Sequence, residues 1–248
     1  MTPSFESEWR GRFERFARAH EDEARISGWS EAGLRRRVRA FQEVLASTPL
    51  PAHAVALDLG CGGGTYVRLL AGLGHRAIGL DYSLPSLGRA RAADPGGKGR
   101  YLSGEAYALP FRAARFDLVT CIGVLQALAS PEMALDEMRR VLRPGGVLVV
   151  EALNARAVPA RAQEARERRR GLPAKVRAYD PDRVDSWLGH RGLVSARRLP
   201  IWLPPRQLPW VGTLLDTPWV RGALGRGDLA RIGAHSFFFV ARRSEGIA

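Results

Sequence analysis

The 248-residue chain is poor in cysteine, in lysine and in long apolar segments. Its two cysteines, Cys61 and Cys121, are too few for a disulfide framework or a cysteine-rich zinc site. No metal is therefore expected, and a reducing cytoplasm is the expected location. No apolar run reaches the roughly 18 residues that a transmembrane helix needs. Residues 1–10 also lack the apolar core of a secretory signal peptide.

Positive charge is in excess and unevenly distributed. The net charge is +13, and residues 155–248 contribute +10 of it through 18 basic and 8 acidic side chains. Four of the six tryptophans lie in the same third of the chain. A basic and aromatic surface favours an anionic ligand or surface. A general preference for arginine explains the charge equally well, because only two of the 38 basic residues are lysines.

Residues 1–50 are predicted to form a helical N-terminal extension. Trp9, Phe13 and Phe16 recur at helical spacing and give one apolar stripe. Ser30 is a suitable N-cap for a second helix. Such an extension either braces the core or covers a pocket, and the sequence favours bracing.

Residues 51–248 are predicted to form an α/β domain, because apolar strands alternate with helical segments. The strands are expected at 54–59, 76–80, 101–102, 116–121 and 147–150, with two more at 193–201 and 236–241. The expected fold is Rossmann-like, with a mostly parallel seven-stranded sheet and helices on both faces.

Two segments of the last third interrupt this alternation. Residues 155–190 and 202–232 are interpreted as insertions on the substrate side of the domain. The first contains a predicted basic helix at 155–170. The second is rich in Trp, Leu, Pro and Gly, and its part 202–220 suits either an apolar pocket wall or a contact with an anionic membrane surface.

A glycine-rich turn follows the first predicted strand. Residues 55–65 read VALDLGCGGGT, an apolar strand that ends in an acid and runs into glycines with G-x-G-x-G spacing. A threonine stands where the dinucleotide fingerprint has its last glycine. Asp81 ends the second strand, where a carboxylate can accept hydrogen bonds from both hydroxyls of a ribose. Asp81 is otherwise explained as an acidic helix cap.

Five segments in register resemble the class I S-adenosylmethionine-dependent methyltransferases. They read LDLGCGGG at 57–64, GLDYS at 79–83, GEA and LPF at 104–106 and 109–111, FDLV at 116–119 and LRPGG at 142–146. The branch that looks most similar methylates small molecules and includes ubiquinone and menaquinone biosynthesis enzymes. The chain departs from it at Gln126, where many relatives have histidine, and at Glu105, where aspartate is usual. The departure at Gln126 leaves the acceptor chemistry open.

The resemblance implies S-adenosyl-L-methionine as the cofactor. It places Asp58 near the methionine ammonium and Asp81 at the ribose hydroxyls. It places Glu105 and the Ala106 amide at the adenine edge, with Ile122 on the adenine face. The expected cofactor-binding set is Asp58, Gly60, Cys61, Gly62, Gly64, Asp81, Tyr82, Glu105, Ala106 and Ile122. Structural roles remain open for several of them, since Ala106 and Ile122 equally suit the core.

Methyl transfer is an in-line displacement at a positively charged sulfonium. Proximity and alignment supply most of the catalysis, and a base is needed only when the acceptor loses a proton. No catalytic residue is therefore assigned. The weak candidates beyond the strand ends are Gln126, Glu151, Asn154, Tyr179 and His235. Each of them suits a lining or structural role better.

The segment after the fourth strand helps to narrow the acceptor. Residues 121–124 read CIGV, which lacks the Asn/Asp-Pro-Pro-Tyr loop of nucleobase amine methyltransferases and the Pro-Cys nucleophile of the cytosine-C5 class. A small, apolar or lipid-like acceptor is expected, and nucleic acid is not. Two alternatives stay open, a methyltransferase acting on a macromolecule and a methyltransferase-like fold that binds without turnover. The sequence does not indicate the oligomeric state.

Overall fold

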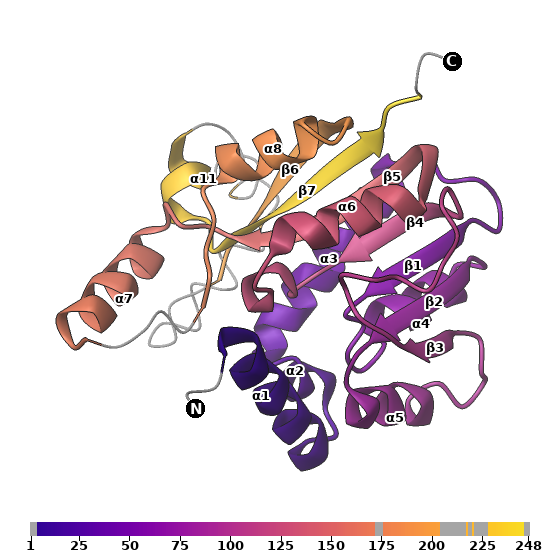
Figure 1. Ribbon diagram of the computed structural model, residues 1–248, viewed down its shortest axis with the longest axis horizontal. Helices are drawn as coiled ribbons and strands as arrows, with labels where there is room; N and C mark the ends of the chain where they lie inside the picture. The colour runs from indigo at the N-terminus through magenta and orange to yellow at the C-terminus, as the bar shows by residue number, and fades with distance from the viewer. Residues whose placement is uncertain (1–3, 172–175, 204–216, 218–219, 221–227, 246–248) are drawn as a thin grey trace.

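The computed structural model describes residues 4–171, 176–203, 217, 220 and 228–245, and contains one seven-stranded sheet (Figure 1). The strands are β1 (Val55–Leu59), β2 (Arg76–Asp81), β3 (Arg100–Ser103), β4 (Phe116–Cys121), β5 (Leu142–Leu153), β6 (Leu193–Ile201) and β7 (Ser236–Arg243). Their order is β3-β2-β1-β4-β5-β7-β6. The first five pair in parallel, and β7 runs antiparallel to both of its neighbours. The predicted Rossmann-like, mostly parallel sheet is confirmed.

Helices cover both faces of the sheet (Figure 1). They are α1 (Phe5–Ala19), α2 (Glu23–Ile26), α3 (Glu31–Ser47), α4 (Thr65–Gly72), α5 (Leu84–Ala92), η1 (Leu125–Ala127), α6 (Pro131–Val141), α7 (Val158–Arg169), α8 (Pro181–Gly189) and α11 (Asp228–Gly233). Helices α6 and α8 pack on one face, and α3, α4 and α5 pack on the other. Strand β4 lies between these layers and is buried at every position, as its apolar sequence predicts for a parallel strand.

The segment LRPGG at 142–146 is already part of β5. Leu142 already pairs with Phe116 of β4, and the register then shifts so that Val147 pairs with Leu118. Gly145 has a φ of 72° inside this irregular part. The strand is therefore longer than the expected 147–150. The register shift is a bulge, where glycine tolerates the left-handed backbone.

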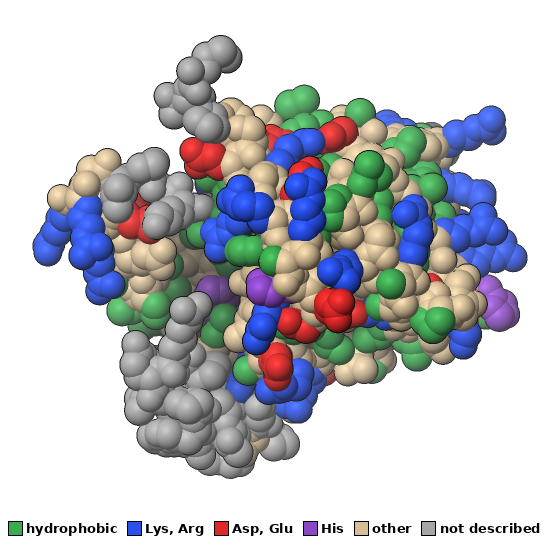
Figure 2. Space-filling model, turned by 90° about the horizontal axis from the view of Figure 1, so that it is seen from below, with side chains coloured by type: hydrophobic (Ala, Val, Ile, Leu, Met, Phe, Trp, Pro, Cys, Tyr) green, Lys and Arg blue, Asp and Glu red, His purple; other side chains and the backbone are tan. Residues whose placement is uncertain are grey.

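The basic excess of the last third divides into two parts. Arg156, Arg198 and Arg231 surround Asp182 and form ion pairs with it. These arginines lower the pKa of Asp182 to about 2, with the hydrogen bond from Arg198 as the largest cause. Helix α7 confirms the predicted basic helix, buries none of its residues, and carries exposed arginines at the left edge of Figure 2.

Much of the tryptophan-rich segment 202–232 lies outside the described residues, so its predicted role as a pocket wall or membrane contact stays a prediction. None of the described helices is both long enough and apolar enough to cross a membrane.

Candidate functional site

A pocket lies at the carboxyl ends of β1, β2 and β4, and it contains about 840 Å³ of empty space, including the part open to solvent. Seven of the ten predicted cofactor-binding residues line it: Gly60, Gly62, Asp81, Tyr82, Glu105, Ala106 and Ile122. The structure thus brings together strand ends that are distant in the sequence.

The first glycines of the turn are required by the backbone. Gly60 has a φ of 72°, and a Cβ placed on it would lie 2.3 Å from Cγ2 of Val124. Gly62 has a φ of 50° and donates its N–H to Oδ2 of Asp81 at 2.9 Å. Both positions adopt the left-handed conformation that side chains disfavour. At these two positions the pocket is therefore lined by main chain, without a side chain.

Asp81 is buried at the end of β2 and joins the turn to the next helix. Its Oδ2 accepts from Gly62, and its Oδ1 accepts from the N–H of Ser83 at 2.9 Å. Burial raises the pKa of Asp81, while these two backbone hydrogen bonds oppose the rise. Each oxygen retains a lone pair beyond these bonds, so the carboxylate can still accept from a pair of ligand hydroxyls.

Asp58 lies behind the glycine turn and not in the described pocket wall. Its Oδ1 accepts from Thr120 Oγ1 at 2.7 Å, and its Oδ2 is buried with no hydrogen-bond partner among the described residues. Burial raises the pKa of Asp58 to about 7. An orphaned buried carboxylate oxygen requires an explanation, and a cationic group near the turn would supply one.

Cys61 and Gly64 also stand outside the pocket wall. The Cys61 thiol packs under β2, where a Cβ on Gly79 would lie 2.7 Å from its Sγ, and burial raises its pKa. Gly64 is the N-cap of α4, with a φ of 83°. Both residues therefore shape the turn. Cys121 is fully buried with a raised pKa, so it does not provide a thiolate nucleophile.

The N-terminal extension forms the other wall of the pocket. Its lining residues are Glu6, Trp9, Arg10 and Phe13 from α1, and Ile26, Ser27 and Trp29 from the segment between α1 and α3. The expectation that the extension only braces the core is therefore wrong for α1. It holds for α3, whose buried Phe41 packs edge-on against Tyr66 of α4 with the ring centroids 5.1 Å apart.

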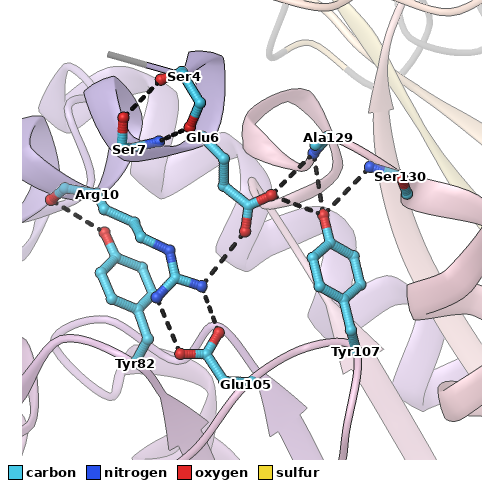
Figure 3. A network of polar contacts seen from close by, with 9 residues as sticks. All are labelled: Ser4, Glu6, Ser7, Arg10, Tyr82, Glu105, Tyr107, Ala129 and Ser130. Carbon is cyan, nitrogen blue, oxygen red and sulfur yellow. Dashed lines mark hydrogen bonds and ion pairs between the residues drawn. The ribbon is translucent and has the colours of Figure 1, made fainter. Parts of the chain in front are cut away.

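A polar network attaches the first turns of α1 to the strand-end loops (Figure 3). Arg10 forms a two-armed ion pair with Glu105, with Nη1 2.9 Å from Oε1 and Nη2 bonded to Oε2. The guanidinium also lies 4.7 Å from the ring centroid of Tyr82. Glu6 joins Arg10 to Tyr107, whose hydroxyl donates to Glu6 Oε2 at 3.0 Å. No pattern in the sequence predicts these contacts, which link residues up to 101 positions apart.

None of the five weak catalytic candidates is among the residues that line this pocket. Glu151 is fully buried and pairs with Arg37, and Asn154 is fully buried and donates to two backbone carbonyls near the end of α11. These contacts give both residues a structural role. Both residues therefore lie near a strand end without lining the pocket.

The other three candidates differ in exposure. Gln126 is buried and donates to the carbonyl of Gly123 at 2.6 Å, which leaves its Oε1 without a partner among the described residues. Tyr179 is half-buried and donates to the carbonyl of Leu125 at 3.1 Å. The side chain of His235 is exposed. Gln126 lies closest in sequence to the pocket wall, between Val124 and Ala127.

The residues present fit S-adenosylmethionine. Asp81 provides an acceptor for ribose hydroxyls, the glycine turn provides close backbone approach, and the orphaned oxygen of Asp58 suits a cation. Glu105 and Ile122 add a carboxylate and an apolar surface to the same pocket. Among the described residues, no group of three or more His, Cys, Asp and Glu side chains could hold a metal ion.

Comparison with known proteins also indicates a methyltransferase. The family model described as "Methyltransferase domain" matches residues 57–150. The chain is 32% identical to trans-aconitate 2-methyltransferase of Variovorax paradoxus, over 78% of each chain. It is 29% identical to the ubiquinone biosynthesis O-methyltransferase of Sinorhizobium medicae, over 62% of this chain and 65% of that one. The chain thus spans just under two thirds of the second relative.

The fold is shared with a solved structure of magnesium protoporphyrin IX methyltransferase from Synechocystis PCC 6803 with bound SAH. That similarity has a TM-score of 0.66 at 16% identity, and covers 97% of this chain and all of that one. The small-molecule branch indicated by the sequence is represented among these relatives. The chain belongs to the class I S-adenosylmethionine-dependent methyltransferases.

Proposed function

We propose that the protein transfers a methyl group to a small, uncharged and largely apolar acceptor that lies against the N-terminal wall of the pocket. The observation that carries this proposal is the composition of that wall. Trp9, Phe13 and Trp29 line the pocket opposite the strand ends. Aromatic side chains of this kind bind planar or apolar groups and exclude water.

The charges in the pocket support an uncharged acceptor. Among the described lining residues, Arg10 is the one basic side chain, and Glu6, Asp81 and Glu105 are acidic. Arg10 is already paired with both Glu6 and Glu105. A polycarboxylate acceptor would therefore meet net negative charge without a free cation to compensate it. A phenol or a similar neutral group avoids that repulsion.

The residues of the two walls would share the work of the reaction. The strand-end residues, above all Asp81, would hold the donor, which supplies a methyl group on a sulfonium when bound. The aromatic wall would orient the acceptor and exclude water, so that the nucleophilic atom and the methyl carbon stand in line. Trp29 is well placed for this role, because a Cβ on Gly123 would lie 2.2 Å from its ring.

The test uses S-adenosylmethionine carrying a labelled methyl group and a small panel of acceptors. We expect label transfer to a catechol or hydroquinone with an apolar substituent, and little transfer to trans-aconitate. Trp29→Leu should lower kcat/KM for the accepted compound, whereas Trp187→Leu, which changes a tryptophan of α8 that is not among the described lining residues, serves as the control. Efficient methylation of trans-aconitate, or an unchanged kcat/KM for Trp29→Leu, would contradict the proposal.

A further inference from the structure

Helix α1 forms one wall of the pocket, so a ligand between that wall and the strand ends is enclosed by the helix. Figure 3 shows that side chains of one early turn, Glu6 and Arg10, make its attachments in this region. Farther along the helix, Arg89 donates to the carbonyl of Ala17 at 3.1 Å. The first half of α1 is therefore attached through two side chains that line the pocket, Glu6 and Arg10, and through Phe5, whose ring centroid lies 4.3 Å from the Arg177 guanidinium.

Arg10 makes more of these attachments than its neighbours do. It pairs with Glu105 after β3, lies over the ring of Tyr82 after β2, and accepts the Tyr82 hydroxyl on its carbonyl at 3.2 Å. Two of the strand ends that build the donor side are thus joined to α1 through one residue. A planar guanidinium suits this arrangement, because it can bind a carboxylate with two nitrogens while it stacks on an aromatic ring.

The ion pair is partly exposed, with 36% of the Arg10 side chain and 49% of the Glu105 side chain accessible to solvent. Pairs of this exposure contribute modestly, because water competes with them. They can break and re-form without unfolding the domain. A wall attached in this way can open to admit a ligand and then close over it.

We propose that Arg10 is a positioning residue of the donor site, which holds α1 closed over the bound donor and thereby slows its escape. The proposal rests on the assignment of this pocket as the methyl-donor site. It extends the proposed function by giving the N-terminal helix a role in the residence time of the donor, in addition to the contact with the acceptor.

The test measures the rate at which S-adenosylhomocysteine dissociates from the full chain by stopped-flow tryptophan fluorescence. We expect Arg10→Ala to raise the dissociation rate about fivefold or more, and to increase amide hydrogen exchange in residues 5–13 of the loaded protein. Arg10→Lys keeps the charge but loses the two-armed geometry, so its rate should lie between those of Arg10→Ala and the wild type. Arg15→Ala is the matched control, because Arg15 is exposed on the same helix and does not line the pocket.

The outcomes separate this inference from the assignment beneath it. If the wild-type protein does not bind S-adenosylhomocysteine, the donor site itself is wrong. If the wild type binds but Arg10→Ala leaves both the dissociation rate and the exchange of α1 unchanged, only the role of Arg10 is overturned. If Arg10→Ala does not fold, Arg10→Lys decides the matter, and a rate equal to that of the wild type overturns the inference.

Discussion

Removal of Arg37 from its buried ion pair with Glu151 is expected to destabilise the fold, and a second substitution at Glu151 should reverse most of that loss. Arg37 of α3 is 2% exposed and Glu151 of β5 is fully buried. The Nε of Arg37 lies 2.9 and 3.0 Å from the two carboxylate oxygens, and the hydroxyl of Ser236 donates to Oε1 at 2.5 Å. Replacement of Arg37 by methionine keeps an apolar stem and removes the cation.

The expected loss follows from the charge that Arg37→Met leaves behind. An unpaired buried carboxylate costs about 3–5 kcal/mol of unfolding free energy. With a urea m-value of about 2–3 kcal/mol per molar, the unfolding midpoint should fall by about 1–2 M. In Arg37→Met/Glu151→Gln both charges are gone, and the Gln amide oxygen can still accept from Ser236. We expect the double variant to recover most of the loss.

Urea unfolding, followed by tryptophan fluorescence and circular dichroism at pH 8, measures these differences. A double variant as unstable as Arg37→Met would show that packing, and not an unpaired charge, accounts for the loss, and would refute this reasoning. The same variants bear on Glu151 as a catalytic candidate. If Glu151 is structural, Arg37→Met/Glu151→Gln should retain donor binding and measurable methyl transfer.

Three more predictions concern the donor side of the pocket. Burial raises the pKa of Asp58 from 3.8 to about 7, so the folded protein without ligand should lose stability from this group as pH rises from about 4 to 7. Asp58→Asn should remove this pH dependence, which amounts to a change in unfolding free energy on the order of 4 kcal/mol. Urea unfolding at a series of pH values measures it. The same dependence of unfolding free energy on pH in both proteins would contradict the prediction. Gly60→Ala should cost about 2–5 kcal/mol through its positive φ and its clash with Val124, whereas Gly88→Ala, with open space at Cβ in α5, should be neutral or slightly stabilising. Asp81→Ala should weaken donor binding in calorimetry at least tenfold, and unchanged affinity would exclude the proposed contact with ribose.

The donor side could be predicted because its determinants are local. The glycine turn and Asp81 each follow a strand that can be recognised from its own residues, and the ends of parallel strands meet at one edge of a sheet. Glu105 follows β3 in the same way. These residues can therefore be placed at one edge of the sheet from the sequence alone.

The N-terminal wall could not be predicted in this way. The stripe of Trp9 and Phe13 suits equally a helix that braces a core and a helix that lines a pocket. The choice depends on contacts such as Arg10 with Glu105, which lie 95 residues apart in the chain. No periodicity in either segment indicates its partner, because a surface ion pair leaves no pattern in the sequence.

The catalytic candidates show a related difficulty. The sequence predicts that Glu151 and Asn154 follow the fifth strand, but Glu151 lies within β5 and Asn154 comes directly after it. Their side chains point to other partners, Arg37 and the backbone near α11. Which face of a strand a polar residue occupies, and whether a distant cation meets it, depends on the packing of α3 and β7.

The pocket has a donor side at the strand ends and an N-terminal wall. This division explains why the sequence identifies the family more readily than the acceptor. The matched segment 57–150 contains every strand-end residue of the described pocket wall, and it excludes Trp9, Phe13 and Trp29. Relatives can therefore share the donor side while their N-terminal walls differ. Since that wall is the one proposed to contact the acceptor, substrate preference can change through substitutions in α1 and the segment after it, with the glycine turn and Asp81 kept.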